Sequence, residues 1–485
     1  MYRYGILAKR RLSALVLAVL AGSFGVSSVD ALDTQPVRCP FCRPEPEYHA
    51  IHLGTLAGGS SYSTAVNNGG HVVGSSGSGN SFSAFYYHNA HAVGKLLSPA
   101  GMTTIGAHVP ALGINDQNVV VGGDAGLFLW SPTAGLKYLP SNYASDPTKT
   151  SQFGGFASAI NNNNVIVGAF GWAPTEVDPG WAVPRAWFCL KSPIFYSLKL
   201  AVVFDDAGMI IDDIGTRIAP QMPSGPFSAY SGGACPRFSK YKSSEAMAIN
   251  DFGVVVGTWF ENGVQSQAWA YWPDRIVHVL GTLGGDNSWA SSVNGNGDVV
   301  GGAAVFGSCV RSNEYGQPGN VGSGFSGQNG CHSPSVLERY NRSGTYRIRA
   351  FMKPARGNMT DLGALATDHF SFANGINNQG DIVGVDRHSV NTSTVFTASW
   401  HDEDVAVLFR KGAVIDLNTI VDPKDIPGGW SIVDARAISN TGYIAATACD
   451  SRNPRNRTRQ CEALRLDPIH RCPRGEPNWP SCSNE

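Results

Sequence analysis

The short motifs in this chain that could do chemistry each lack part of what that chemistry needs. Cys39-Pro-Phe-Cys42 has the spacing of a redox dithiol, but the βαβ pattern that such a motif needs is absent around it. Residues 322–327, Gly-Ser-Gly-Phe-Ser-Gly, come near a nucleophile elbow and also fit a dinucleotide-binding loop. No strand pattern precedes them and no helix pattern follows them, so we interpret this segment as a Gly/Ser-rich loop.

Candidate metal and acid sites are also incomplete. The turn Asn294-Gly-Asn-Gly-Asp298 resembles a calcium loop, but calcium needs several converging carboxylates. Glu176 and Asp178 are a close acid pair without a counterpart in the other repeat units, and we interpret them as part of a solvated loop. We interpret the 12 dispersed histidines as surface residues, half of them in the first two units: His49, His52, His71, His88, His91 and His108. The sequence thus predicts no catalytic residue, no metal site and no cofactor.

Tryptophan side chains supply the candidate binding residues. Most of the 11 tryptophans occupy predicted strands, where we expect them to pack in the core. Four fall in segments that we predict to be loops between strands: Trp172, Trp181, Trp259 and Trp289. Because buried aromatic anchors often dominate the energy of recognition, these four are the ligand-binding candidates.

A repeated eight-residue turn defines the elements that would carry any site. Seven copies occur, six beginning with Asn and one with Ser: Asn67, Asn115, Asn161, Asn250, Asn294, Asn377 and Ser439. Each copy closes on small or β-branched residues and a final Gly or Ala. The fourth residue is Gly or Asn, the types that best tolerate positive φ, and the leading Asn can form an Asx turn. The pattern predicts a structural turn within a β-hairpin.

Two further strands follow each hairpin, an aromatic one and one that precedes a Leu-Gly or similar pair. Two segments compete for the aromatic strand in the third unit (186–188 and 201–204) and in the sixth (398–400 and 406–409). Four strands a unit and a basic spacing of 44 to 48 residues predict an all-β fold, a seven-bladed β-propeller of four-stranded antiparallel blades. We interpret the two longest gaps between turns, 89 and 83 residues, as insertions rather than an eighth blade. A lone strand at about 48–54 would complete the last blade and close the ring.

These units resemble the HAF repeats of extracellular bacterial proteins over about residues 48–467. Leu280-Gly-Thr-Leu-Gly-Gly285 and Met359-Thr-Asp-Leu-Gly363 match that family's Leu-Gly segment, and Arg349-Ala-Phe351 stands for its His-Ala-Phe element. The long Cys-containing insertions depart from the family's pattern. The resemblance implies a secreted repeat protein and carries no catalytic motif.

The N-terminus predicts export. Basic residues at 9–11 precede an apolar stretch at 12–20 that is too short to span a bilayer, and no later run is long enough for a membrane span. We predict secretion to the extracellular space or periplasm and four segments: a signal peptide (1–31), an N-terminal tail (32–47), the propeller (48–467) and a C-terminal tail (468–485). With 36 basic and 37 acidic residues and no basic patch, we expect a monomer that does not bind nucleic acid.

Ten Cys in a chain predicted to be exported indicate disulfides. We predict Cys449–Cys461 across a loop between neighbouring strands. Cys309–Cys331 would staple the insertion of the fifth unit, and Cys189–Cys235 is a further candidate pair. The termini of a closed ring lie close together, so the remaining four could pair across them: Cys39, Cys42, Cys472 and Cys482.

Loop lengths indicate which end of the propeller works. Connections alternate between the two ends of each blade, and nearly all the variation in their length falls opposite the Asn turns, at what we call the variable face. Variable loops on a rigid scaffold are where function gathers. We predict that this face binds an extracellular glycan or protein, as a non-catalytic binding or adhesion module. Two alternatives stay open: an extracellular propeller hydrolase or lyase acting on polysaccharide, and a structural surface-layer component.

Overall fold

A computed structural model describes the chain within the compact unit Pro44–Glu485. The described residues are 46–56, 59–78, 81–88, 101–106, 110–123, 127–139, 142–143, 146–150, 155–172, 198–207, 209–214, 242–261, 265–305, 348–367, 369–387, 404–450 and 460–469. Several features discussed above lie outside them: the predicted signal peptide, Trp181, the pair Glu176 and Asp178, and residues 322–327.

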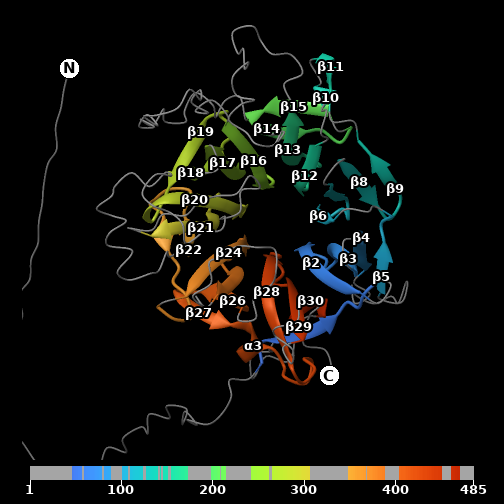
Figure 1. Cartoon of the computed structure of the whole chain (residues 1–485), viewed down its shortest axis with the longest axis vertical. Helices are drawn as coiled ribbons and strands as arrows, with labels where there is room; N and C mark the ends of the chain where they lie inside the picture. Colours follow the sequence, from blue (N-terminus) through green and yellow to red (C-terminus); the bar gives the residue numbers. More distant parts are fainter. Residues whose placement is uncertain are drawn as a thin grey trace, which may run out of the picture. The chain divides into compact units, whose positions relative to one another are not determined.

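Seven antiparallel sheets form a ring, so the predicted seven-bladed β-propeller is confirmed (Figure 1). Blades 1 to 3 contain β2 (Ser60–Val66), β3 (Val72–Ser78), β4 (Ser81–His88), β5 (Gly101–Thr104); β6 (Ala111–Ile114), β7 (Val120–Gly122), β8 (Phe128–Ser131), β9 (Gly135–Tyr138); and β12 (Gly155–Ile160), β13 (Ile166–Trp172), β14 (Leu198–Phe204), β15 (Met209–Asp213). Blades 4 to 6 contain β16 (Lys242–Ile249), β17 (Val255–Glu261), β18 (Gln265–Tyr271), β19 (Val277–Gly281); β20 (Gly284–Val293), β21 (Val299–Val305), β22 (Ile348–Lys353), β23 (Thr360–Asp361); and β24 (Phe370–Ile376), β25 (Ile382–Arg387), β26 (Asp404–Arg410), β27 (Ala413–Asp416). Blade 7 contains β28 (Trp430–Ile438), β29 (Ile444–Asp450), β30 (Cys461–Pro468) and, as its outer strand, β1 (Tyr48–His52).

The first strand of each blade lies at the centre of the ring, against the first strands of both neighbours. These strands close a circle: β2, β6, β12, β16, β20, β24 and β28. The apolar core lies between adjacent blades, as where Val256 and Ala268 of blade 4 pack with Ala290 and Phe351 of blade 5. Stability therefore depends on each blade meeting the next.

The Asn turn joins the first and second strands of each blade. Its fourth residue has positive φ in all seven copies: Gly70, Asn118, Asn164, Gly253, Gly297, Gly380 and Gly442. In the copies that begin with Asn, the side-chain oxygen accepts from backbone N–H groups two and four residues on. Asn115, for example, accepts from Gln117 at 3.1 Å and Val119 at 2.9 Å. The predicted Asx turn is confirmed.

A steric contact explains why six of the seven turns end on glycine. The first strand bulges three residues before each turn, and the bulge sets a backbone oxygen against the eighth turn residue. A Cβ on Gly301 would lie 1.9 Å from the Trp289 oxygen, a distance that no side chain tolerates. Blade 7 has Ala446 at this position, and its first strand carries a second bulge between Ile432 and Asp434. Blade 7 thus departs from the repeat at the residue that ends its turn.

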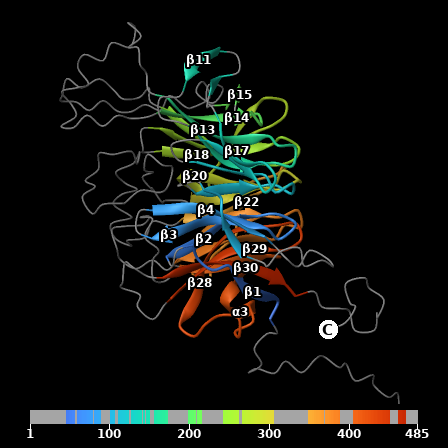
Figure 2. The ribbon, with the colours of Figure 1, turned by 90° about the vertical axis from the view of Figure 1, so that its right-hand side faces the viewer.

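The N-terminal strand closes the ring, as predicted. β1 lies beside β30 (Figure 2) and pairs antiparallel with it. In this register Ala50 lies opposite Leu466. The outer edge of β1 is covered by the segment that follows a short helix, α3 (Leu417–Ile420). There Tyr48 forms a parallel bridge with Val421 and its oxygen accepts from Asp422 N at 2.9 Å. The outer edge of β1 is therefore bonded to this segment at Tyr48, which limits pairing with a strand of another chain.

Blade 3 departs from the four-stranded pattern. Its outer strand β15 pairs in parallel with β10 (Asn142–Tyr143), which in turn pairs with β11 (Asp146–Thr150). Of the competing aromatic segments, the later one forms the strand in both units, since β14 contains 201–204 and β26 contains 406–409. No helix among the described residues has the length and apolarity to cross a membrane.

Candidate functional site

The Asn turns are joined by a circle of hydrogen bonds at the centre of one face. The side-chain nitrogen of each leading Asn donates to the backbone oxygen of the next leading residue: Asn67 to Asn115 (2.9 Å), Asn115 to Asn161 (3.1 Å), Asn161 to Asn250 (3.0 Å), Asn250 to Asn294 (2.9 Å), Asn294 to Asn377 (3.1 Å) and Asn377 to Ser439 (3.4 Å). Blades 7 and 1 are joined by the second turn residues instead, because Asn440 N donates to Asn68 Oδ1 at 2.8 Å. The leading Asn side chains are structural.

A serine on the first strand forms a second recurring contact between blades. Ser371 Oγ accepts from Ala350 N at 2.9 Å and donates to Gly363 O at 2.5 Å, both in the preceding blade. Ser288 and Ser61 make the same two bonds in their blades. The alanine belongs to the aromatic strand and the glycine to the Leu-Gly pair. The recurring motifs thus hold neighbouring blades together, and a functional site must use polar residues outside the repeat.

The assignment of the candidate tryptophans to loops is wrong for three of the four. Trp259 lies in β17, Trp289 in β20, and Trp172 is the last residue of β13. Trp259 and Trp289 are 1% and 7% exposed, and Trp259 packs in the core with Trp269. The error arose because these strands extend beyond the Val/Ile run that marks them in the sequence. Neither Trp259 nor Trp289 offers an exposed ring to a ligand in this structure.

Among the predicted disulfides, Cys449–Cys461 is confirmed. It joins the ends of β29 and β30 at the variable face, and both residues are buried beside Val433. The other predicted partners lie outside the described residues: Cys39, Cys42, Cys189, Cys235, Cys309, Cys331, Cys472 and Cys482.

Charged side chains that the repeat does not explain gather in blades 6 and 7. At the variable-face end of blade 6, Arg387 forms two bonds with Asp404, Nε to Oδ1 and Nη2 to Oδ2, both of 2.6 Å. On β28, Asp434 pairs with Arg436 and accepts from Asn374 of blade 6 at 3.1 Å. We call these five residues the Arg/Asp cluster.

The carboxylates of the Arg/Asp cluster are buried and hold more exposed guanidinium groups. The side chains of Asp404 and Asp434 are 1% and 3% exposed, against 17% and 48% for Arg387 and Arg436. Burial raises the pKa of Asp434 and Asp404 adds to the rise, whereas Arg436 and Arg387 oppose it. The two pairs therefore form one electrostatic unit. Arginines fixed by carboxylates present planar donors in set directions.

A His–Asp pair beside the cluster fastens a connection between blades 5 and 6. Asp386 Oδ2 accepts from Leu365 N at 2.8 Å, and its Oδ1 is bonded to His369 Nδ1. Arg349 donates to the Thr367 oxygen at 2.5 Å. Because these bonds all end in the same connection, we interpret the pair as structural.

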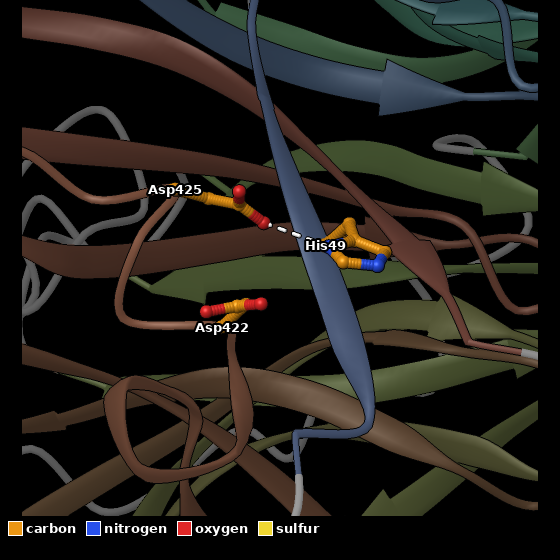
Figure 3. Close-up of side chains that lie close together, drawn as sticks. All are labelled: His49, Asp422 and Asp425. Carbon is orange, nitrogen blue, oxygen red and sulfur yellow. Dashed lines mark hydrogen bonds and ion pairs between the residues drawn. The ribbon is translucent and has the colours of Figure 1, made fainter.

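One group of side chains has the spacing of metal ligands (Figure 3). His49 of β1 and two aspartates after α3, Asp422 and Asp425, each place one ligand atom within 4.8 Å of the others. Nδ1 of His49 is 2.9 Å from Oδ2 of Asp425, which also accepts from Ala50 N at 3.1 Å. The sequence gives no local sign of this group, because His49 and Asp425 are 376 positions apart in the chain. The available signal was the predicted closing strand, which carries His49 to the last blade.

His52 holds the same segment from the other side of β1. Its Nε2 is bonded to the Asp425 backbone oxygen at 2.8 Å and its Nδ1 to Glu462 at 3.0 Å. The bond to Glu462 raises the pKa of His52, and the bond to His52 lowers the pKa of Glu462. These contacts tie β1 to both of its neighbours.

Comparisons with known proteins leave the family open. No protein-family model and no curated protein matches the chain. It is similar in structure to a subtype N11 neuraminidase-like protein of A/flat-faced bat/Peru/033/2010, with 8% identity, a TM-score of 0.31, and 88% of this chain and 95% of that chain covered. It is also similar to an α-L-arabinofuranosidase from Podospora anserina, with 8% identity, a TM-score of 0.29, and 87% and 97% covered.

Proposed function

We propose that this protein is an exported, HAF-type repeat propeller that binds a polyhydroxylated ligand, such as a glycan chain, on its variable face without catalysis. One observation carries the proposal. The recurring Asn and Ser side chains are engaged between blades, whereas the Arg/Asp cluster stands outside the repeat and reaches the variable-face end of blade 6. Export is supported by the N-terminal pattern and by Cys449–Cys461, because disulfides persist in oxidising compartments.

The chemistry of the Arg/Asp cluster suits hydroxyl groups. Vicinal hydroxyls both accept and donate hydrogen bonds, and a site of fixed donors and acceptors binds them without rearranging its own side chains. Arg436 is the most exposed member, and buried Asp434 fixes the direction of its guanidinium. Arg436 lies on the innermost strand β28, three residues before the turn at Ser439, so we expect it to touch the part of the ligand that enters the centre of the ring from the variable face.

Burial of the two acids weighs against the hydrolase or lyase alternative. A general acid or nucleophile must reach the reacting atom. The side chains of Asp404 and Asp434 are 1% and 3% exposed, and each is already paired with an arginine. Within the described residues the cluster supports recognition better than proton transfer.

The test begins with the mature protein on a glycan array and against a panel of polysaccharide substrates. The glycan that binds is then titrated into the unmodified protein and into the double variant Arg436→Gln/Asp434→Asn. The double variant removes both charges, so no buried carboxylate is left without its arginine. Arg356→Ala is the matched control, because Arg356 is exposed in the β22–β23 connection at the opposite end of the propeller.

We expect the double variant to bind at least about 10-fold more weakly, the loss of an anchor worth over 1 kcal/mol, with a melting temperature close to that of the unmodified chain. Arg356→Ala should bind normally. Unchanged affinity in the double variant would move the site away from the cluster. Turnover of any glycan by the pure protein would support the hydrolase instead.

A further inference from the structure

We propose that His49, Asp422 and Asp425 bind a divalent transition-metal ion, Zn²⁺ above all, that fastens the N-terminal strand to the segment covering it. The site is separate from the Arg/Asp cluster and from ligand binding on the variable face. It would make ring closure depend on a metal ion.

The geometry is close to that of a bound ion. Ligand atoms around zinc lie about 2.0 to 2.2 Å from it, and therefore roughly 3 to 4 Å from each other. The three ligand atoms here lie within 4.8 Å of one another, so small side-chain rotations suffice. Figure 3 shows the Asp425 carboxylate extending toward the His49 ring, and the Asp422 carboxylate beside them on the same segment. The proton shared by His49 and Asp425 would leave as the ion binds.

The charge balance of the region independently points to a cation. Two other acids near β1 share an arginine: Arg410 lies 2.7 Å from Glu47 and 2.9 Å from Asp381. Within the described part of the chain, neither Asp422 nor Asp425 forms an ion pair with a lysine or arginine. Two neighbouring carboxylates and a histidine are thus left without a permanent positive charge, which a divalent ion would supply.

The ligand types select the metal. One imidazole with two carboxylates suits zinc, and less tightly manganese, whereas calcium takes oxygen ligands alone. The side chains of His49 and Asp425 are 51% and 27% exposed, so solvent can reach the ion and complete its coordination. His52 orients the segment from behind through its bond to the Asp425 backbone oxygen.

An ion at this site would stabilise the closed ring, because its ligands come from two segments that are far apart in the chain. β1 and the 420–425 segment meet only after the ring has closed, and they are held by backbone bonds such as Glu47 N to Ile420 O at 2.7 Å. An ion that binds only this closed arrangement stabilises the folded state by mass action. Zinc should therefore slow the local opening of β1 more than that of other outer strands.

The experiment uses the full mature chain without a histidine tag, stripped with EDTA and desalted. Zinc, manganese and calcium chlorides are titrated by calorimetry, and melting temperature and hydrogen exchange of the β1 amides are measured with and without zinc. The variants are His49→Ala and Asp422→Asn. Asp422→Asn keeps the oxygen that accepts from Lys424 N at 3.0 Å, so the segment should fold. His278→Ala is the matched control, because His278 is exposed on the outer strand β19 of blade 4.

We expect one saturable zinc site, a melting temperature raised by about 2 to 5 °C at zinc 100-fold above the dissociation constant, and slower exchange in β1. Both variants should weaken zinc binding at least about 10-fold, and His278→Ala should not. The proposal is overturned if zinc leaves β1 exchange unchanged, if both variants bind zinc like the unmodified chain, or if calcium binds more tightly than zinc.

Discussion

A single asparagine side chain in the turn ring forms four bonds and joins two blades. Asn115 is 3% exposed and accepts twice within its own turn, and its side-chain nitrogen donates to the Asn161 backbone oxygen and the Asn164 side-chain oxygen in the next blade. Asn115→Ala leaves two part-buried N–H groups, the Asn161 carbonyl and the Asn164 side-chain oxygen without this partner, and we expect the free energy of unfolding to fall by about 2 to 3 kcal/mol. Urea unfolding measures it. Asn296→Ala, which loses one exposed bond to Asn378, is the control and should cost under about 1 kcal/mol.

Ser439 is the leading turn residue whose side chain bonds only within its own turn. A longer side chain at this position should add the missing hydrogen bond to the next blade. The Ser439 hydroxyl accepts from Tyr443 N at 3.1 Å, as Asn does, but it cannot reach the next blade. The backbone oxygen of Asn115 accepts from Asn118 N within its own turn and from the side-chain nitrogen of Asn67. The backbone oxygen of Asn67 also accepts from its own turn, from Gly70 N, so it can accept the side chain of an asparagine at 439 in the same way. We expect Ser439→Asn to stabilise the fold by about 0.5 to 1.5 kcal/mol, measured by urea unfolding. A destabilised variant would mean that blades 7 and 1 stand too close for the longer side chain.

His71 should make stability depend on pH. Burial lowers the pKa of His71 to about 4, and His88 and Arg465 add to the shift from 6.5. The unfolded chain therefore takes up a proton first, so stability present above pH 6.5 is lost as pH falls toward 4. His71→Phe keeps a ring stacked on Tyr86 and removes this titration. Between pH 7 and 4.5 the unmodified chain should lose about 2 kcal/mol more than the variant in urea unfolding. His278→Ala should retain the full pH dependence.

Among the elements, the hairpin of β29 and β30 is closed by the one disulfide that the described residues contain. Its sequence separation of 12 residues corresponds to roughly 2 to 3 kcal/mol in the chain-entropy model. Cys449→Ala/Cys461→Ala should lower the urea midpoint accordingly without changing the ring. A midpoint equal to that of the unmodified chain would show that the bond constrains nothing. Non-reducing peptide mapping tests the remaining predicted pairs, of which Cys309–Cys331 is the foremost.

Strand β28, which departs from the repeat by a second bulge, also carries part of the candidate site. β28 has a second bulge between Ile432 and Asp434, and Asp434 of the Arg/Asp cluster flanks it. The other first strand with a second register shift is β20 of blade 5, between Gly284 and Ser288. Departures from a regular pattern that lack a structural need tend to mark function. Blade 7 combines this irregularity with the closure strand and the disulfide.

At the scale of the whole molecule, β1 completes blade 7 and so closes the ring in which each blade packs against its neighbours. A chain that begins at residue 46 retains β1, and one that begins at 53 lacks it. We expect the shorter chain to lose roughly 3 to 5 kcal/mol, because buried Tyr48 and Ala50 are removed and the edge of β30 is exposed. Urea unfolding and light scattering compare the two chains. Equal stability and solubility would show that blade 7 is complete with three strands.

Periodicity in the sequence determined the blade count, the Asn turns and the closing strand. Each depends on residues close together in the chain: the turn needs an acceptor at its first position and positive φ at its fourth, and a strand needs a run of apolar residues. The Cys449–Cys461 bond was predictable for the same reason, since its partners lie on neighbouring strands of one hairpin. Local pattern is enough wherever local geometry decides.

Only the tertiary structure decided where the side chains outside the repeat meet. Nothing near Trp259 in the sequence shows that β17 continues to Glu261 and buries the ring against blade 3. Arg387 and Asp404 lie 17 positions apart in the chain, and Asp434 comes from the next blade, so no short sequence motif predicts that they meet. His49 reaches Asp425 because the first strand of the chain is the last strand of the ring. Ring closure and the packing of blades bring such groups together. The repeat pattern in the sequence does not indicate which residues outside the repeat will then contact each other.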